Sequence, residues 1–343
     1  MHPVNTMNKW INRLFGIAEK PSGLPAAPVD AAAAVADMPA AGAPAAALLP
    51  CAPDLDAIFY RWLIGGNAAP AAEASILEQA ILDALDALSR SELAGANLVP
   101  RVPAILPQLL KSLRDEHISA SDLSQQIAHD VVLVAEVIRE ANSPYYHPAK
   151  PIASLENAVM VLGQNGLRLL MARVAFRPVI NLQSGHFTQL AAPHIWAQSE
   201  MCADTCCRLA AEMQVDPFEA FLAGLIQNVG LIVAFRLIDR LYDGNALPGS
   251  DAFCRALGVH ARVLSALIGQ QWGFPQEVVI AIEDMSWGLP DAGEDPLHKI
   301  LATSDRVSKI RLLVDHQLLG EDEEAVLGGL SASAQRCFTR LER

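Results

Sequence analysis

The chain has 343 residues, of which 52% are hydrophobic but only 6% are aromatic. Its apolar residues are therefore mostly Ala, Leu, Val and Ile, a composition that favours helices packed on helices. The 25 basic and 38 acidic residues give a net charge of −13. Because an acidic surface repels phosphate backbones, we expect no direct nucleic-acid partner.

Residues 1–20 contain the first predicted element, a short amphipathic helix within the stretch MNKWINRLFGIAEK (residues 7–20). Its apolar stripe consists of Trp10, Leu14 and Ile17, and lysines and an arginine occupy the polar positions. Such a helix can lie on an anionic membrane surface or dock on a partner protein. The structural alternatives are a frayed terminus and a helix folded back on its own domain.

Residues 21–53 are rich in Ala and Pro, carry little charge and show no apolar periodicity, which predicts a disordered linker. The charge-free run 38–53 contains four prolines and is too short and too broken to span a membrane. The six cysteines show no paired spacing, and nothing resembles a secretory signal. We therefore expect a cytoplasmic protein, with residues 7–20 as a candidate for peripheral contact with the inner face of the membrane.

Helical patterns dominate from residue 54 onward. Residues 54–96 hold two amphipathic segments, LDAIFYRWLI and EASILEQAILDALDAL, and form a predicted N-terminal helical region. Residues 97–300 form the predicted main domain, and residues 301–343 a C-terminal helical extension. One predicted helix begins at Pro296 and either closes the bundle or pairs with another chain. Since no stretch alternates as a strand does, the predicted fold class is all-α.

The apolar run FLAGLIQNVG (residues 221–230) contains two neighbouring amides, Gln227 and Asn228. A strong helix start precedes the run, since Asp216 supplies a cap, a proline follows it and an acid lies three residues beyond the cap. Neither amide can ionise, and a carboxamide oxygen is a poor ligand for transition metals. Two such side chains in an apolar helix call for an explanation.

Five local patterns resemble the HDOD domains of bacterial regulatory proteins. VPRVP resembles their Leu-Pro-x-Leu-Pro opening, and IAHDVVLVAEVIREANSPYY resembles their Asp-Pro-x-Leu and Ala-Asn-Ser-x-Tyr-Tyr signature. IASLENAVMVLG is similar to Ile-x-Ser-Leu-x-x-Ala-Ile-x-x-Leu-Gly, and DPFEAFLAGLIQNVG to Ala-Phe-x-Ala-Gly-Leu-Leu-His-Asp-Ile-Gly. VHARVLSALIGQQWGFPQEVVIAI resembles the closing run with His-Ala-x-Val and Trp-Gly-Leu-Pro. The five patterns occur in the family's order over about 200 residues.

The resemblance implies an HD-like helical bundle, because HDOD domains are related to the HD-domain phosphohydrolases. In active HD enzymes, histidines and aspartates hold one or two metal ions that activate water. The resemblance places Gln227 and Asn228 where those enzymes have an adjacent His-Asp pair, and Gln198 where they have a first histidine ligand. His260 remains from a later ligand position.

The carboxylates Glu283 and Asp284 lie beyond His260, where HD enzymes show further histidines. The candidate degenerate pocket therefore comprises Gln198, Gln227, Asn228, His260, Glu283 and Asp284. The structural interpretation is that these groups hydrogen-bond to one another, to the backbone or to water. The functional alternatives are a small ligand such as a nucleotide, or a weak metal site. We expect no catalytic residue, no bound metal and no cofactor.

The stretch ANSPYY (residues 141–146) is a candidate structural or partner-contact turn. Asn142 and Ser143 can end the preceding helix and bond local backbone, while the proline prevents its continuation. Tyr145 and Tyr146 then fold back as packing residues or, alternatively, contact a partner, since tyrosines are enriched in interaction hot spots.

These observations predict a non-catalytic signalling or scaffold protein that acts through protein–protein contacts in bacterial signal transduction. The resemblance implies partners from two-component or cyclic-dinucleotide pathways. One alternative is a metal-dependent nucleotide phosphohydrolase that uses His260 with Glu283 or Asp284. The other alternative is a cyclic-dinucleotide receptor.

Overall fold

The computed structural model describes residues 54–66, 73–91, 98–101, 106–107, 110, 125, 128, 131–143, 146, 148–180, 185–244, 246–287, 295–319 and 327–341. The amphipathic helix predicted in residues 1–20, the linker predicted in residues 21–53 and Tyr145 lie outside these described residues. The chain divides into two units, Met1–Pro53 and Asp54–Arg343, and every element below belongs to the second.

Helices form all the regular structure in the described part of this second unit. The predicted all-α class is confirmed, because no strand occurs among the described residues. The helices in chain order are α2 (Leu55–Leu63), α3 (Ile76–Ser89), α6 (Val131–Ala141), α7 (Leu155–Ile180), α8 (His186–Ala210), α9 (Pro217–Ile226), α10 (Val229–Leu241), α11 (Asp251–Gln271), α12 (Gln276–Asp284), the 3-10 helix η2 (Met285–Trp287), α13 (Pro296–Asp315) and α15 (Ala332–Arg340).

Side-chain caps fix where several of these helices begin. Asp216 accepts hydrogen bonds from the amides of Phe218 at 2.8 Å and Glu219 at 2.9 Å, so the predicted start of α9 is confirmed. Ser75 and Glu78 form a reciprocal capping box at the start of α3. Each cap satisfies amides that the first helical turn leaves unpaired, which stabilises the helix by about 1 kcal/mol.

α7 changes direction at Gly163, where φ is 66°. This left-handed conformation, which glycine adopts without a steric penalty, ends the first segment of the helix, Leu155–Leu162. The chain then resumes a helical course to Ile180. Gly163 thus marks a kink between two helical segments.

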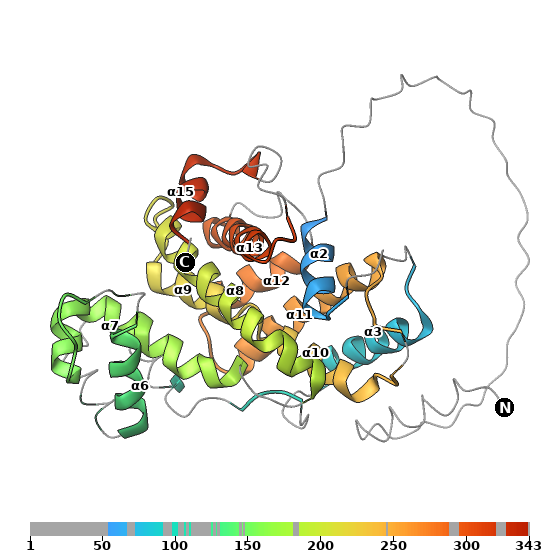
Figure 1. The fold of residues 1–343 in the computed structure, drawn as a ribbon, viewed down its shortest axis with the longest axis horizontal. Helices are drawn as coiled ribbons and strands as arrows, with labels where there is room; N and C mark the ends of the chain where they lie inside the picture. Colours follow the sequence, from blue (N-terminus) through green and yellow to red (C-terminus); the bar gives the residue numbers. More distant parts are fainter. Residues whose placement is uncertain are drawn as a thin grey trace, which may run out of the picture. The chain divides into compact units, whose positions relative to one another are not determined.

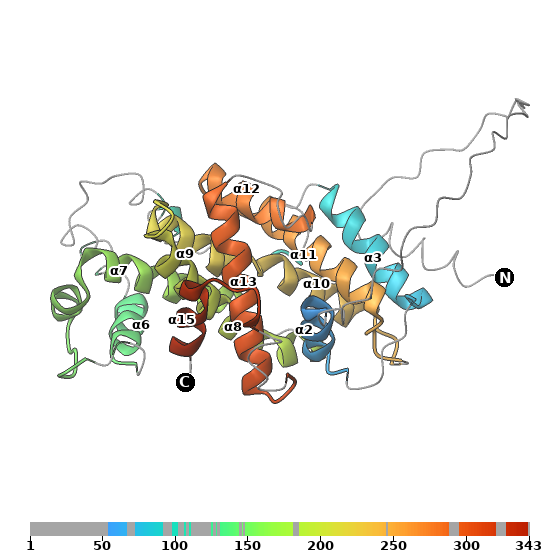
Figure 2. The ribbon, with the colours of Figure 1, turned by 90° about the horizontal axis from the view of Figure 1, so that it is seen from above.

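α8 lies at the centre of the unit. It packs against α9, α13 and α10, while α11 packs against α10, α12 and α3. α2 contacts α11, α13 and α8, so it covers helices that carry much of the core. In both views of the ribbon, α6 and α7 lie at one end of the bundle and α3 lies at the other (Figures 1 and 2).

Two glycines allow the central helices to approach closely. A Cβ atom at Gly224 of α9 would lie 2.6 Å from the Cα atom of Ala203 in α8, and one at Gly230 of α10 would meet the carbonyl oxygen of Ala261 in α11 even more closely. A Cβ atom does not lie this close to a non-bonded heavy atom, so both helix pairs require glycine. The turn between α9 and α10, which carries Gln227 and Asn228, is thereby held between α8 and α11.

Two described helical stretches, Pro217–Leu241 and Asp251–Gln271, are long and apolar enough to cross a membrane. The bundle buries 94% of the most apolar window of the first stretch and 56% of that of the second. Core helices of globular proteins have the same composition, so length and hydropathy are weak support for a membrane span here.

Candidate functional site

Three of the predicted pocket residues lie in one buried polar cluster. Asn228, in the turn between α9 and α10, donates its side-chain amide to the Oε1 atom of Gln198 in α8 and, at 3.0 Å, to the Oγ atom of Ser199. Gln198 donates in turn to Asp305 Oδ1 and Ser308 Oγ on α13, both at 2.9 Å. Gln198, Ser199 and Ser308 are completely buried. The amides therefore join α8, α13 and the turn between α9 and α10.

Gln227 belongs to the same cluster but points in another direction. Its side-chain amide donates to the sulfur of Cys202 at 2.9 Å, and its backbone carbonyl accepts from the hydroxyl of Ser265 at 2.5 Å. The same Ser265 hydroxyl accepts from the Gly230 amide at 2.8 Å. Ser265 therefore satisfies a carbonyl at the end of α9 and an amide at the start of α10, and this fixes the turn against α11.

Burial keeps Cys202 from acting as a thiolate ligand. Its thiol is completely buried, and the loss of solvation raises its pKa well above the ordinary value of a cysteine. The thiol is therefore protonated at neutral pH, and it accepts the hydrogen bond from Gln227 as a weak acceptor.

Four charged side chains extend the cluster toward α2. The ammonium of Lys309 on α13 lies 2.7 Å from Asp305 and 2.7 Å from Asp56 on α2. Arg262 on α11 lies 3.1 Å from the same Asp56 carboxylate and 3.3 Å from Asp305. Two cations therefore face two carboxylates, and the formal charge of this group is zero.

Two aromatic side chains of α2 also lie against the Lys309 ammonium. Its nitrogen lies 5.1 Å from the centroid of the Tyr60 ring and 5.5 Å from that of Phe59, within the range of cation–π attraction. The Tyr60 hydroxyl is also within 3.5 Å of the ammonium. Only 1% of the Lys309 side chain is exposed, whereas 34% of the Asp56 side chain is.

The ion pairs outweigh burial in setting the charges of this group. Burial raises the pKa of Asp56, but Lys309 and Arg262 lower it more, so the carboxylate titrates well below its usual range. Burial lowers the pKa of Lys309, but Asp305 and Asp56 raise it more, and the net pKa lies above the ordinary value. Both groups are therefore charged at neutral pH.

His260 does not lie in this cluster. On α11 it is two residues before Arg262, roughly 200° around the helix, and therefore faces a different side. It is half-buried beside α3; burial lowers its pKa, and nearby Asp86 partly offsets that change. Among the described residues, His260 makes no hydrogen bond or ion pair with Gln198, Gln227 or Asn228.

The two carboxylates of α12 also lie apart from the cluster. The side chain of Glu283 is exposed and that of Asp284 is partly exposed. Within the described part of the chain, neither makes a hydrogen bond or ion pair with the cluster. The carboxylates that do reach the amides and cations come from α2 and α13, which differs from the ligand positions expected from the sequence.

The charged half of the cluster was not predicted from the sequence, although its residues on α13 follow a regular spacing. Asp305 and Lys309 stand four residues apart, each preceded by a serine, within the stretch TSDRVSKI. This spacing places the four polar residues on one face of a helix, and all four are buried. The serines and the ion-pairing residues recur at the same spacing as the apolar residues of α13, so the pattern alone does not separate a buried polar face from an exposed one.

The turn after α6 is held together by Asn142. Its side-chain nitrogen donates to the carbonyls of Ile138 at 2.8 Å and Ile152 at 2.7 Å, and its oxygen accepts from the Ile152 amide at 2.8 Å. The Ser143 amide bonds to the Glu140 carbonyl at 2.9 Å. Asn142 therefore joins the end of α6 to the chain that leads into α7, and partly buried Tyr146 follows it.

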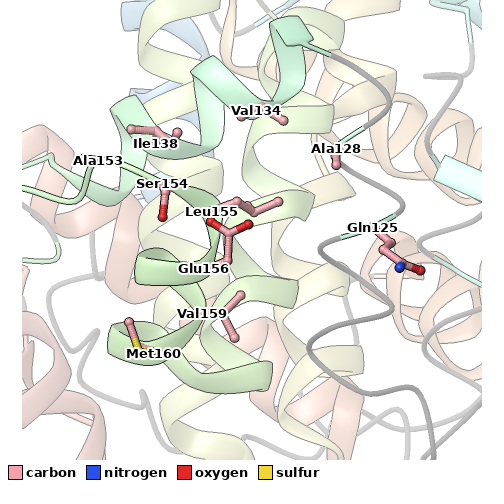
Figure 3. A pocket seen from close by; sticks show the side chains of 10 residues that line it. All are labelled: Gln125, Ala128, Val134, Ile138, Ala153, Ser154, Leu155, Glu156, Val159 and Met160. Atoms are coloured by element: carbon pink, nitrogen blue, oxygen red, sulfur yellow. The ribbon is translucent and has the colours of Figure 1, made fainter.

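A groove of about 710 Å³ is separate from the polar cluster. It lies between α6 and the first segment of α7, beside two further described residues, Gln125 and Ala128 (Figure 3). Its lining is mostly apolar and shares no residue with the cluster. The other lining residues are Val134, Ile138, Ala153, Ser154, Leu155, Glu156, Val159 and Met160.

The polar cluster does not fit the metal ion that an HD-like fold implies. Among the described residues, no three His, Cys, Asp or Glu side chains gather in a way that could hold a metal. The Gln198 oxygen already accepts from Asn228, and Asp305 is shared by Gln198, Lys309 and Arg262. A divalent cation there would face an ammonium and a guanidinium, which repel it.

Comparison with known proteins gives the same fold. A family model described as HDOD domain matches residues 99–286, more than half of the chain. A crystal structure of an HDOD domain protein of unknown function from Geobacter sulfurreducens aligns with a TM-score of 0.56 at 22% identity, over 76% of this chain and 94% of that one. A protein from Shewanella amazonensis SB2B, provisionally named a metal-dependent phosphohydrolase, aligns with a TM-score of 0.54 at 16% identity, over 78% and 98%.

Two further relatives extend the comparison. A protein from Marinobacter aquaeolei VT8, provisionally named a signal transduction protein, aligns with a TM-score of 0.50 at 21% identity, over 83% of this chain and 62% of that one. An uncharacterised protein from Treponema pallidum (strain Nichols) is 24% identical over 208 residues, which are 57% of this chain and 39% of that protein. The chain thus spans well under half of that curated relative. At these identities the structural likeness shows a shared fold.

Proposed function

The chain belongs to the HDOD domain family, and on that premise we propose that it is a non-catalytic signalling protein that acts through protein–protein contacts. The fold is one on which HD enzymes build a metal site, so the chemistry of this chain depends on which side chains occupy that region. Here the neighbouring amides Gln227 and Asn228 are bonded to protein groups, and neither supplies the charge that a divalent ion needs.

The buried ammonium of Lys309 is the observation that carries the proposal. It lies between two carboxylates, one of which, Asp305, also accepts from Gln198. The protein thus provides its own cation at the carboxylates that would otherwise attract a metal. A buried ion pair that is fully bonded holds helices in one arrangement and leaves no open coordination position for water.

Metal content and hydrolysis test the non-catalytic part of the proposal. We expect the purified full-length protein to retain no stoichiometric metal after incubation with Mn²⁺, and to hydrolyse neither bis(p-nitrophenyl) phosphate nor a cyclic dinucleotide. The Asp305→Asn variant should behave as the wild type does. The matched variant Asp284→Asn changes a carboxylate that lies outside the cluster. Stoichiometric metal with turnover would overturn the proposal; loss of turnover in Asp305→Asn alone would place the chemistry at the cluster, and loss in Asp284→Asn alone would place it at α12.

The two alternative functions have tests of their own. Turnover abolished by His260→Ala would support a phosphohydrolase that uses His260 with a carboxylate of α12. Calorimetry with cyclic dinucleotides tests the receptor alternative, for which we expect no heat of binding at high micromolar ligand. Binding in that range would instead favour a small-molecule receptor.

Affinity capture tests the protein-contact part of the proposal. The full-length protein and a chain lacking residues 1–53 are used as baits in parallel. We expect both baits to recover at least one common protein in an amount that repeated washing does not reduce. The reason is that we place the contact on the helical unit, residues 54–343. Recovery that depends wholly on residues 1–53 would move the contact to the N-terminal segment.

A further inference from the structure

The groove between α6 and α7 carries an exposed apolar surface. The side chain of Met160, which lines the groove, is 76% exposed, and that of the adjacent Val161 is 58% exposed. Val159 and Ile138 continue this surface into the groove (Figure 3). Single exposed apolar residues are normal on protein surfaces, but two neighbouring ones beside a depression with a mostly apolar lining mark a candidate interaction site. Methionine also adapts its shape to different partners.

We propose that this groove is the docking site for an amphipathic helix of a partner protein, with an apolar face and a lysine or arginine at its edge. The inference rests on the proposed function, because it names the kind of partner through which the signalling protein acts. The partner helix would bind in the open groove, and the buried polar cluster would make no contact with it.

The hydrogen-bonding groups at the groove favour a helix over an extended peptide. An extended peptide needs free backbone groups along a strand, and the described residues at the groove belong to helices and their connections. The Ser154 hydroxyl already accepts from the Asn157 amide at 3.2 Å and bonds to Glu156. A helix satisfies its own amides and needs only apolar contact, which this lining offers.

The charge of Glu156 at the groove favours a cationic partner. Glu156 is the one charged side chain among the described residues that line it. The carboxylate accepts from its own backbone amide and from the Ser154 hydroxyl, and these bonds lower its pKa, so it is ionised at neutral pH. The net charge of −13 on the whole chain also favours the approach of a basic partner.

The shape and lining of the groove argue against a small molecule. The groove is shallow and open, and most of its lining is apolar. Small-ligand sites enclose most of the ligand and orient it with several convergent polar groups. A lipid surface would require a projecting apolar face, whereas this apolar surface continues into a depression.

Fluorescence anisotropy with a model helix tests the proposal on the full-length protein. The probe is a labelled peptide of leucine and lysine with leucines at i, i+3, i+4 and i+7, and the control is its permuted sequence, which has no apolar face. We expect the probe to bind in the micromolar range. Met160→Ser should weaken binding about tenfold, because the complex with the variant no longer buries a methionine side chain. Ile76→Ser is the matched control, since Ile76 is 78% exposed and belongs to α3, the helix at the other end of the bundle.

The charge of Glu156 has a smaller and salt-dependent effect. Glu156→Gln should weaken binding of the leucine–lysine probe about twofold at low salt and have no effect at high salt, because an exposed charge is screened. The same helix built from leucine and glutamate should bind more weakly than the lysine probe to the wild type. Equal binding of both probes would remove the cationic part of the proposal.

Several outcomes would overturn the docking site itself. These are absence of probe binding, equal affinity of Met160→Ser and Ile76→Ser, or equal affinity for the permuted peptide. Self-association that Met160→Ser abolishes in sedimentation would identify a second copy as the occupant and reject a partner helix. The two proposals can fail separately. Metal-dependent turnover with intact probe binding would reject the non-catalytic function and leave the docking site standing. Loss of probe binding without any turnover would reject only the docking site.

Discussion

The polar cluster and the α6–α7 groove are opposite arrangements of polar and apolar side chains. In the cluster, polar groups such as Gln198 and Lys309 are buried, and each is bonded to protein. In the groove, apolar groups such as Met160 remain in water. A buried polar group whose bonds are all made gains little from a ligand, whereas an exposed apolar group gains by being covered. This difference favours a structural role for the cluster and a binding role for the groove.

The largest effect should come from removing the buried cation. Lys309→Met leaves the carboxylates of Asp305 and Asp56 facing each other with Arg262 alone, which should cost about 3–5 kcal/mol of unfolding free energy. Lys299→Met on the same helix is the control, and because Lys299 is exposed its change should stay within about 0.5 kcal/mol. Urea denaturation measures both. A loss below about 1 kcal/mol for Lys309→Met would contradict the structural role given to the ammonium.

A matched pair of glutamines isolates the effect of burial. Gln198 and Gln79 each donate a side-chain amide to an aspartate oxygen at 2.9 Å, but the first bond is buried and the second is exposed. Gln198→Glu places a carboxylate against Asp305 and should cost about 2–3 kcal/mol. Gln79→Glu places one against Asp83 in water and should cost a few tenths of a kcal/mol. Equal effects in thermal or urea unfolding would show that the cluster is hydrated.

The pH dependence of stability tests the charge of Asp56. Its folded pKa lies below the ordinary value of about 3.9, so its contribution is present above that pH and is lost as pH falls through the folded pKa. At pH 7, Asp56→Asn should be less stable than the wild type by about 1–2 kcal/mol, since the side chain is about one-third exposed.

The difference between wild type and Asp56→Asn should shrink when urea denaturation is repeated below about pH 4. The raised pKa of Lys309 has the opposite sign, and its contribution is lost only as pH rises above about 10. A difference that stays constant from pH 7 to pH 3 would contradict an ionised Asp56 in the folded state.

The smallest effect on stability should come from the groove. Met160→Ser, which weakens the model helix, should change the unfolding free energy by less than about 0.5 kcal/mol, because the side chain is 76% exposed. The same denaturation series measures this value. A larger loss would mean that Met160 contributes to the core, and its effect on binding would then reflect folding.

The sequence predicted the elements of the site better than their assembly. Local patterns predicted helix starts such as Asp216, because a cap acts within one turn. The resemblance singled out Gln198 and Asn228, which the structure brings into contact across 30 residues of chain. The bond from Gln198 to Asp305 spans 107 residues and depends on how α13 packs on α8, which no local pattern contains. The position of His260 depends on the rotation of α11, which places Arg262 at the cluster instead.

α2 and α13 show that the folding unit extends beyond the recognised family region. The family match covers residues 99–286, yet Asp56, Asp305 and Lys309 all lie outside it. A fragment cut to that match would keep Arg262, Gln198 and both amides of the α9–α10 turn but lose the carboxylates and the ammonium that balance them. For this chain, the shortest piece expected to fold as the whole does begins near Asp54, immediately after the Ala/Pro-rich segment.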